Sequence, residues 1–165
     1  MAEQLKNLYS KEFIEKLANK LFLIYSDFEK ENFKKSIFDN TWQDLELKQR
    51  MRHIALTLNR YLPFSYDKQL EILKKAKEDF TGLEAMVFQD FVEVFGLDDF
   101  AESMNALEVF TINSSSEFAI RQFILKYEEQ AMNQMKIWSQ SPNEHIRRLA
   151  SEGCRPRLQI GRAHV

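Results

Sequence analysis

Apolar residues recur at steps of three and four along almost the whole chain, and this spacing limits the possible folds more than any other feature. Such a period places one apolar stripe along an α-helix and fits no strand. The clearest runs are Ile14, Leu17, Leu21, Ile24 and Phe28, then Leu47, Met51, Ile54, Ala55, Leu58 and Leu62, and later Ala131, Met135 and Trp138. Pro63 stops the second run, and shorter helices are expected at residues 33–38 and 66–77.

The scarcity of turn residues supports the same all-helical fold. Only 4 glycines and 3 prolines occur in 165 residues, whereas a sandwich or barrel needs many of both for its turns. Residues 87–95 are β-branched and aromatic enough to form a strand. We interpret them as a buried helix because no partner strand or hairpin turn lies nearby.

Four pairs of residues have the spacing of a helix-starting capping box, in which a small polar residue precedes an acid or amide by three positions. They are Asn40 with Gln43, Thr81 with Glu84, Ser114 with Glu117, and Ser141 with Glu144. Pro142 follows Ser141 and suits a first helical position. In this interpretation Glu117 has a purely structural role.

The length fits one domain of eight or nine short helices, arranged as a bundle or as a stacked array of helix pairs. Residues 114–139 are expected to form one pair, and Ser141 to open the next. No repeat period is visible. The last helix has no expected partner after Gly153, so we interpret the chain as truncated.

Several features bear on compartment and partners. No stretch is long and apolar enough to span a bilayer, and no signal-peptide core follows the N-terminus. Cys154 is the only cysteine, so no internal disulfide is possible and a reducing, cytoplasmic compartment is expected. The net charge of −2 means that a nucleic-acid partner would need a local basic patch.

Most kinds of catalytic site are excluded by the absence of their motifs. There is no glycine-rich phosphate loop or nucleophile elbow, and His53, His145 and His164 form no metal motif, so no cofactor is expected. Cys154 is interpreted as a small helix-end residue. Trp42 and Trp138 are expected in the core.

Residues 141–157 contain the most informative cluster. Around one helix and its exit lie His145, Arg147, Arg148, Arg155 and Arg157. Clustered guanidinium groups suit phosphate oxygens, to which they make charge-assisted bonds. A structural alternative is open at this point, because Arg148 is four residues from both Glu144 and Glu152 and could be ion-paired in solvent.

The chain resembles the AlkC-type branch of the DNA alkylation repair glycosylases, which are built from HEAT-like helical repeats. The resemblance rests on residues 45–56, 91–100, 114–121, 123–127 and 143–158, and it covers nearly everything up to Leu158. It implies an all-α, HEAT-like array of short antiparallel helices spanning residues 1–158.

The resemblance also implies an activity, the hydrolysis of the N-glycosidic bond of bases methylated on ring nitrogens, such as 3-methyladenine. The implied partner is double-stranded DNA, bound by a monomer without base flipping. The family's functional acids fall on Glu117 and Glu152, and Arg148 lies between them as a DNA-contacting residue. A methylated base is cationic and leaves easily, so the enzyme mainly needs carboxylates that stabilise an oxocarbenium-like sugar.

The chain departs from the family pattern after Leu158. The family continues into a Pro-Trp pair and a further repeat that supplies the main catalytic Asp, whereas residues 159–165 match nothing in it. We expect those residues to be a non-native tail and the fragment to be inactive alone. Two alternatives share the fold: a scaffold that binds protein, and a DNA binder without catalysis.

Overall fold

In the computed structural model, the structure of residues 5–155 is described, and every element in that part of the chain is a helix. The expectations for Arg157 and for the tail at residues 159–165 lie outside the described residues. In chain order the elements are α2 (Lys11–Ile24), α3 (Lys30–Ile37), the short 3₁₀ helix η1 (Trp42–Asp44), α4 (Leu47–Tyr61), α5 (Tyr66–Lys77), α6 (Met86–Phe95), α7 (Phe100–Phe110), α8 (Glu117–Lys126), α9 (Glu128–Ser139) and α10 (Glu144–Gly153).

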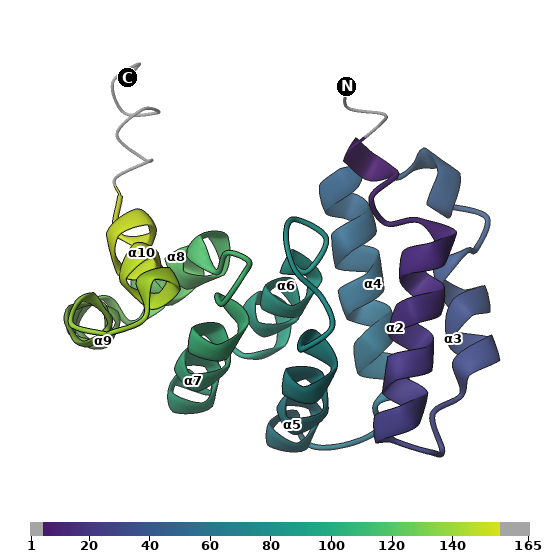
Figure 1. The fold of residues 1–165 in the computed structure, drawn as a ribbon, viewed down its shortest axis with the longest axis horizontal. Coiled ribbons are helices and arrows are strands. Elements are labelled where there is room, and N and C mark those ends of the chain that lie inside the picture. Colours follow the sequence, from purple (N-terminus) through teal and green to yellow (C-terminus); the bar gives the residue numbers. More distant parts are fainter. Residues whose placement is uncertain (1–4, 156–165) are drawn as a thin grey trace.

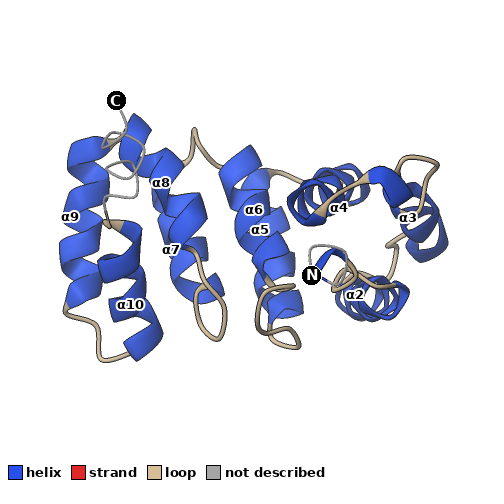
Figure 2. Cartoon of the chain, turned by 90° about the horizontal axis from the view of Figure 1, so that it is seen from above, coloured by secondary structure: helices blue, strands red, loops and turns tan. Residues whose placement is uncertain are grey.

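The helices form two rows, as in a helical-repeat array (Figures 1 and 2). One row consists of α4, α6, α8 and α10, each packed on the next. In the other row, α2 packs on α5 and α5 on α7, while α9 packs against α8 and α10. We call the exposed surface of α4, α6, α8 and α10 the inner face. Figure 1 shows the first turn of α4 and the last turn of α10 on the same side of the molecule, on either side of α6.

The predicted apolar stripes form the core. Ile14, Leu17 and Leu21 of α2 are fully buried, and so are Ile54 and Leu58 of α4. Burying such side chains supplies most of the free energy that holds short helices together. The all-helical prediction is confirmed for the described residues, and Phe28 and Leu62 are buried but lie beyond the ends of α2 and α4.

The strand-like segment at residues 87–95 is a helix, as we interpreted it. Val87, Phe88, Phe91 and Val92 of α6 are all fully buried. The helix is apolar because it packs against α4, α7 and α8. A helix covered on several sides can be apolar over most of its surface, which explains the strand-like sequence of α6.

The four predicted capping boxes are wrong. The helices nearest to them begin later than expected, at Thr41 as N-cap of η1, Ala85 of α6, Ser116 of α8 and Asn143 of α10. In α10 the Asn143 side chain accepts the backbone N–H groups of His145 and Ile146, so Pro142 lies before the helix. A capping box forms instead at Glu46, whose backbone N–H donates to Gln49 at 2.8 Å.

Both tryptophans belong to the core, as expected. Trp42 is 4% exposed and Trp138 is 1% exposed. The indole N–H of Trp138 donates to Glu108 Oε1 at 2.7 Å, which satisfies its one polar atom. In the part of the chain that the structure describes, no helix is long and apolar enough to cross a membrane.

Candidate functional site

The last turn of α10 packs directly on the first two turns of α8, at a position where the sequence has Gly153. A Cβ atom there would lie 2.8 Å from Ile120 Cγ2 and 3.0 Å from Met135 Cε. The missing side chain therefore allows α10 to approach both α8 and α9. Glu152 precedes this glycine, and Glu117 lies one turn before Ile120, so the contact brings the two predicted acids onto adjoining turns of neighbouring helices.

Glu117 is the first residue of α8 and is half-buried. Its backbone N–H donates to Ser115 Oγ at 3.3 Å, whereas its carboxylate makes no hydrogen bond or ion pair within residues 5–155. Ser114, its expected capping partner, instead donates to the Gly82 carbonyl and accepts from Gln89. The capping role predicted for Glu117 is therefore absent, although its charge still suits a helix N-terminus.

The charged side chains of α10 do not pair as the sequence allowed, with Arg148 bound to Glu144 or Glu152. Glu152 and Arg155 form an ion pair, with Arg155 Nη1 3.4 Å from Glu152 Oε2, and the two side chains are 29% and 64% exposed. Arg148 is exposed and forms no ion pair with either Glu144 or Glu152 among the described residues. Its guanidinium is thus open to an anionic ligand.

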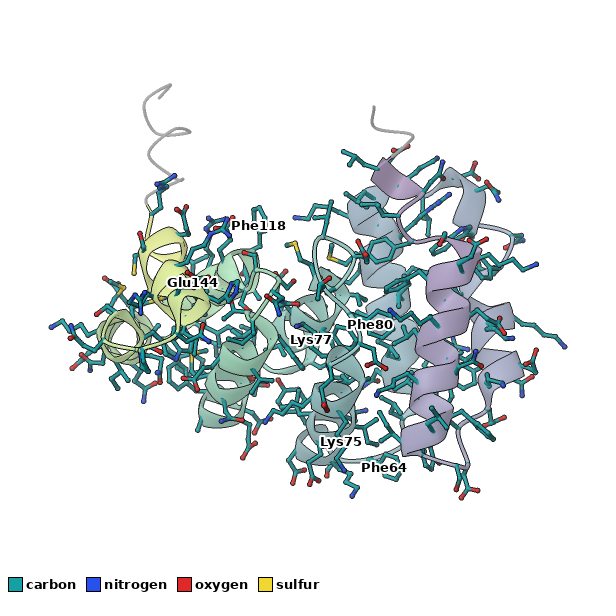
Figure 3. The ribbon with its side chains drawn as sticks, viewed as in Figure 1. Phe64, Lys75, Lys77, Phe80, Phe118 and Glu144 are labelled. Atoms are coloured by element: carbon teal, nitrogen blue, oxygen red, sulfur yellow. The ribbon has the colours of Figure 1, made fainter. Side chains whose placement is uncertain are left out.

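The other residues of the predicted cluster lie near the start of α10. Arg147 Nη1 donates to the Ser141 carbonyl at 2.8 Å, which ties its guanidinium to the connection between α9 and α10. His145 is half-buried in the first turn, near Glu144, which Figure 3 labels. Arg147 thus reaches back toward the start of α10, whereas Arg155 lies beyond its last residue.

Cys154 caps the C-terminal end of α10 and is half-buried, in line with its expected role as a helix-end residue. Burial raises the pKa of its thiol. A thiol with a raised pKa is a weak nucleophile at neutral pH, because the thiolate is the reactive form.

Sequence reasoning missed a second group of residues on the inner face. Phe118, next to Glu117, is 36% exposed, and two cations flank its ring. Lys48 Nζ of α4 lies 5.2 Å from the ring centroid, and Arg121 Cζ lies 4.9 Å from it. Figure 3 shows Phe118 on α8 at the side of the molecule where α4 begins. No local pattern predicts this contact, because it joins α4 to α8 across α6.

A wide hollow lies away from these acids. It has a volume of about 860 Å³ and is lined by residues of α2, α3, η1 and α4. Its Lys34 is paired with Glu15 and Glu31, and its Arg50 stacks on Trp42 at 4.5 Å. We therefore do not place the functional site there. No group of three or more His, Cys, Asp or Glu side chains within residues 5–155 is arranged to hold a metal ion.

Two rows of short antiparallel helices, with acids and arginines on the inner one, define a helical-repeat protein. The chain is similar to the Pseudomonas fluorescens alkylpurine DNA glycosylase AlkC bound to DNA containing an abasic site analog, with a TM-score of 0.88 and 35% identity. This likeness covers 93% of the chain and shows that the chain has the helical-repeat fold of the matching part of AlkC.

A curated relative is similar over almost the same region. The chain is 43% identical over 159 residues to the uncharacterized protein YhaZ of Bacillus subtilis. The chain spans less than half of both proteins, 43% of the AlkC chain and 44% of YhaZ. No protein-family model matches the chain.

Proposed function

We propose that this chain is the N-terminal part of a DNA glycosylase that removes N-methylated bases, of the 3-methyladenine type, from double-stranded DNA without flipping them. The observation that carries the proposal is the likeness to AlkC, whose solved structure is a complex with DNA containing an abasic site analog. The placement of Glu117 and Glu152 on adjoining turns of neighbouring helices of the inner row supports it.

In the proposed mechanism the two carboxylates act electrostatically. A methylated base carries a positive charge and leaves the sugar with little acid assistance, so the developing charge to be stabilised is on the sugar ring. Within residues 5–155, the Glu117 carboxylate makes no hydrogen bond or ion pair, and Glu152 is paired with the exposed Arg155. Carboxylates held in place before the reaction stabilise an oxocarbenium-like sugar without reorganising.

Arg148 and Arg155 are the proposed contacts to the phosphate backbone, together with His145, Arg147 and Arg157. Arg148 and Arg155 are the stronger candidates, because Arg148 forms no ion pair with the described residues and Arg155 is 64% exposed. We further propose that the protein acts as a monomer in the cytoplasm. The fragment alone is expected to bind DNA weakly and to lack excision, because the family's main catalytic Asp is not in this chain.

Salt dependence tests the binding step. Each phosphate contact that is lost should lower the slope of log affinity against log salt by about 0.9, because fewer counterions are released. The double variant Arg148→Gln/Arg155→Gln should therefore bind a labelled duplex with a slope reduced by about 1.8. Arg60→Gln, which removes an exposed arginine near the far end of α4, is the matched control and should change the slope little. An unchanged slope in the double variant would favour the protein-binding scaffold.

Base release tests the chemical step in the full-length parent protein. Glu117→Gln and Glu152→Gln should each lower the rate of 3-methyladenine release while leaving duplex binding intact. A parent protein that binds alkylated and undamaged DNA equally, and releases no base, would contradict the glycosylase and leave the non-catalytic DNA binder.

A further inference from the structure

A second pair of cations lies on α4, on the opposite side of α6 from the arginines of α10. Lys48 and Arg52 are one turn apart, at positions i and i+4, and therefore point in similar directions from the helix. Both are exposed. They line a hollow of about 430 Å³ together with Gln49 and Leu56.

Arg52 is held rigidly on the side that faces α6. Its Nε donates to Asp90 Oδ2 at 2.8 Å and its Nη2 to Asp90 Oδ1 at 3.0 Å, a two-point contact that fixes the plane of the guanidinium. The same Nη2 donates to Glu93 at 3.1 Å. Nη1 makes no hydrogen bond to the described residues, and the side chain is 44% exposed. Arg52 therefore presents one open donor edge in a fixed orientation.

Lys48 is held less firmly than Arg52. It forms no ion pair within residues 5–155, and its ammonium group lies over the Phe118 ring. A cation over an exposed aromatic ring is held weakly, so an anion can displace the ring without a large loss. Phe118 directly follows Glu117, so Lys48 contacts the same turn of α8 that contains the candidate catalytic acid.

The cations around this hollow are more exposed than the carboxylates. Arg52 is 44% exposed, against 9% for Asp90 and 24% for Glu93. Burial and the neighbouring Asp90 raise the pKa of Glu93, whereas Arg52 and Lys48 lower it. The hollow is thus lined by the fixed donor edge of Arg52, which is bonded to Asp90, and by the exposed Lys48 ammonium group.

We propose that Lys48 and the open edge of Arg52 bind a phosphodiester of the DNA backbone and set the position of the duplex along the inner face. This inference rests on the proposed function, since it takes DNA as the ligand. With the α10 arginines, the α4 pair holds the duplex from both sides of α6. Lys48 then fixes which sugar faces Glu117.

The test measures binding of a fluorescently labelled 24-base-pair duplex to this chain across a series of NaCl concentrations. Lys48→Gln should reduce the salt slope by about 0.9, the value expected for one lost phosphate contact. Arg52→Lys, which keeps the charge beside Asp90 but removes the fixed donor edge, should weaken binding severalfold and leave the slope nearly unchanged. Lys68→Gln on α5, whose lysine pairs with Glu71, is the matched control and should behave as the wild type.

The outcomes separate the two proposals. If Arg148→Gln/Arg155→Gln lowers the slope but Lys48→Gln and Arg52→Lys do not alter binding, the α4 site is wrong and the proposed function stands. If the wild-type chain shows no salt-dependent binding to the duplex, both are overturned. Circular dichroism of each variant verifies that the helices are intact.

Discussion

Gly153→Ala tests the packing that joins the candidate site together. The added Cβ would lie 2.8 Å from Ile120 Cγ2, closer than carbon atoms approach without strain. Ile120 is fully buried and β-branched, so this methyl cannot rotate away without moving α8. Met135 Cε, at 3.0 Å, is the tip of a flexible side chain and can shift more easily.

The expected size of the effect follows from two opposing contributions. Alanine improves helix propensity over glycine by at most about 1 kcal/mol, and less at the last residue of a helix. Overpacking a filled core costs about 1–3 kcal/mol. We expect a net loss of about 1–2 kcal/mol in the free energy of unfolding. For a chain of this length each kcal/mol lowers Tm by about 2–4 °C.

Thermal unfolding followed by circular dichroism measures this loss. Ser151→Ala, at an exposed position of the same helix, is the control and should change the stability by no more than about 0.5 kcal/mol. In an Ile120→Ala background the penalty of Gly153→Ala should shrink, because the clashing methyl is gone. A Gly153→Ala variant with unchanged or raised Tm would refute the close packing of α10 on α8.

Two further predictions concern titratable groups. Cys154 should react with a thiol reagent at pH 8 more slowly than a cysteine in a short peptide, because burial raises its pKa, and urea should remove the difference; equal rates in the native protein would contradict this. The pKa of Glu93 is raised by burial and by Asp90, so the folded state binds more protons than the unfolded state, and the contribution of Glu93 to stability falls as pH rises through that range. Urea unfolding of Glu93→Gln should therefore show a stability that rises relative to wild type between pH 4.5 and pH 7, and a constant difference would argue against the raised pKa.

The helices could be predicted from the sequence because their periodicity is local. The helix expected at residues 66–77 is α5 itself, and the proline after Leu62 marks the end of α4. Even α6, which resembles a strand, could be assigned because no strand partner exists for it. The apolar spacing within each helix decides which face is buried, whatever its neighbours are.

Helix starts were harder to predict, because their polar side chains take part in tertiary contacts. Ser114 has the right spacing to cap α8, but its hydroxyl donates to Gly82 and accepts from Gln89 instead. Ser141 accepts from the backbone N–H of Asn143, and α10 then begins after Asn143. A capping box is a local pattern, and a distant partner for either residue is enough to break it.

The candidate site was also predictable in its local features but not in its tertiary contacts. The charged residues of α10 could be found because they are close in sequence, but their pairing could not: Glu152 pairs with Arg155, and Arg148 forms no ion pair with the described residues. Lys48 and Phe118 were missed because the contact between them depends on how α4, α6 and α8 stack. Nothing in the positions of these two residues along the sequence predicts their contact.

Glu117 does not form the capping box expected with Ser114, and this strengthens the proposal that Glu117 is a functional residue. A half-buried carboxylate loses part of its hydration, and without a hydrogen bond from the protein this free-energy cost is not compensated. A helix start as such is better served by Ser, Thr or Asn, whose side chains cap the backbone. Residues that break local rules in this way tend to lie at functional sites. Glu117 also directly precedes Phe118, whose ring is flanked by two cations, and lies one turn from the Gly153 contact, so it stands among the other residues of the proposed site.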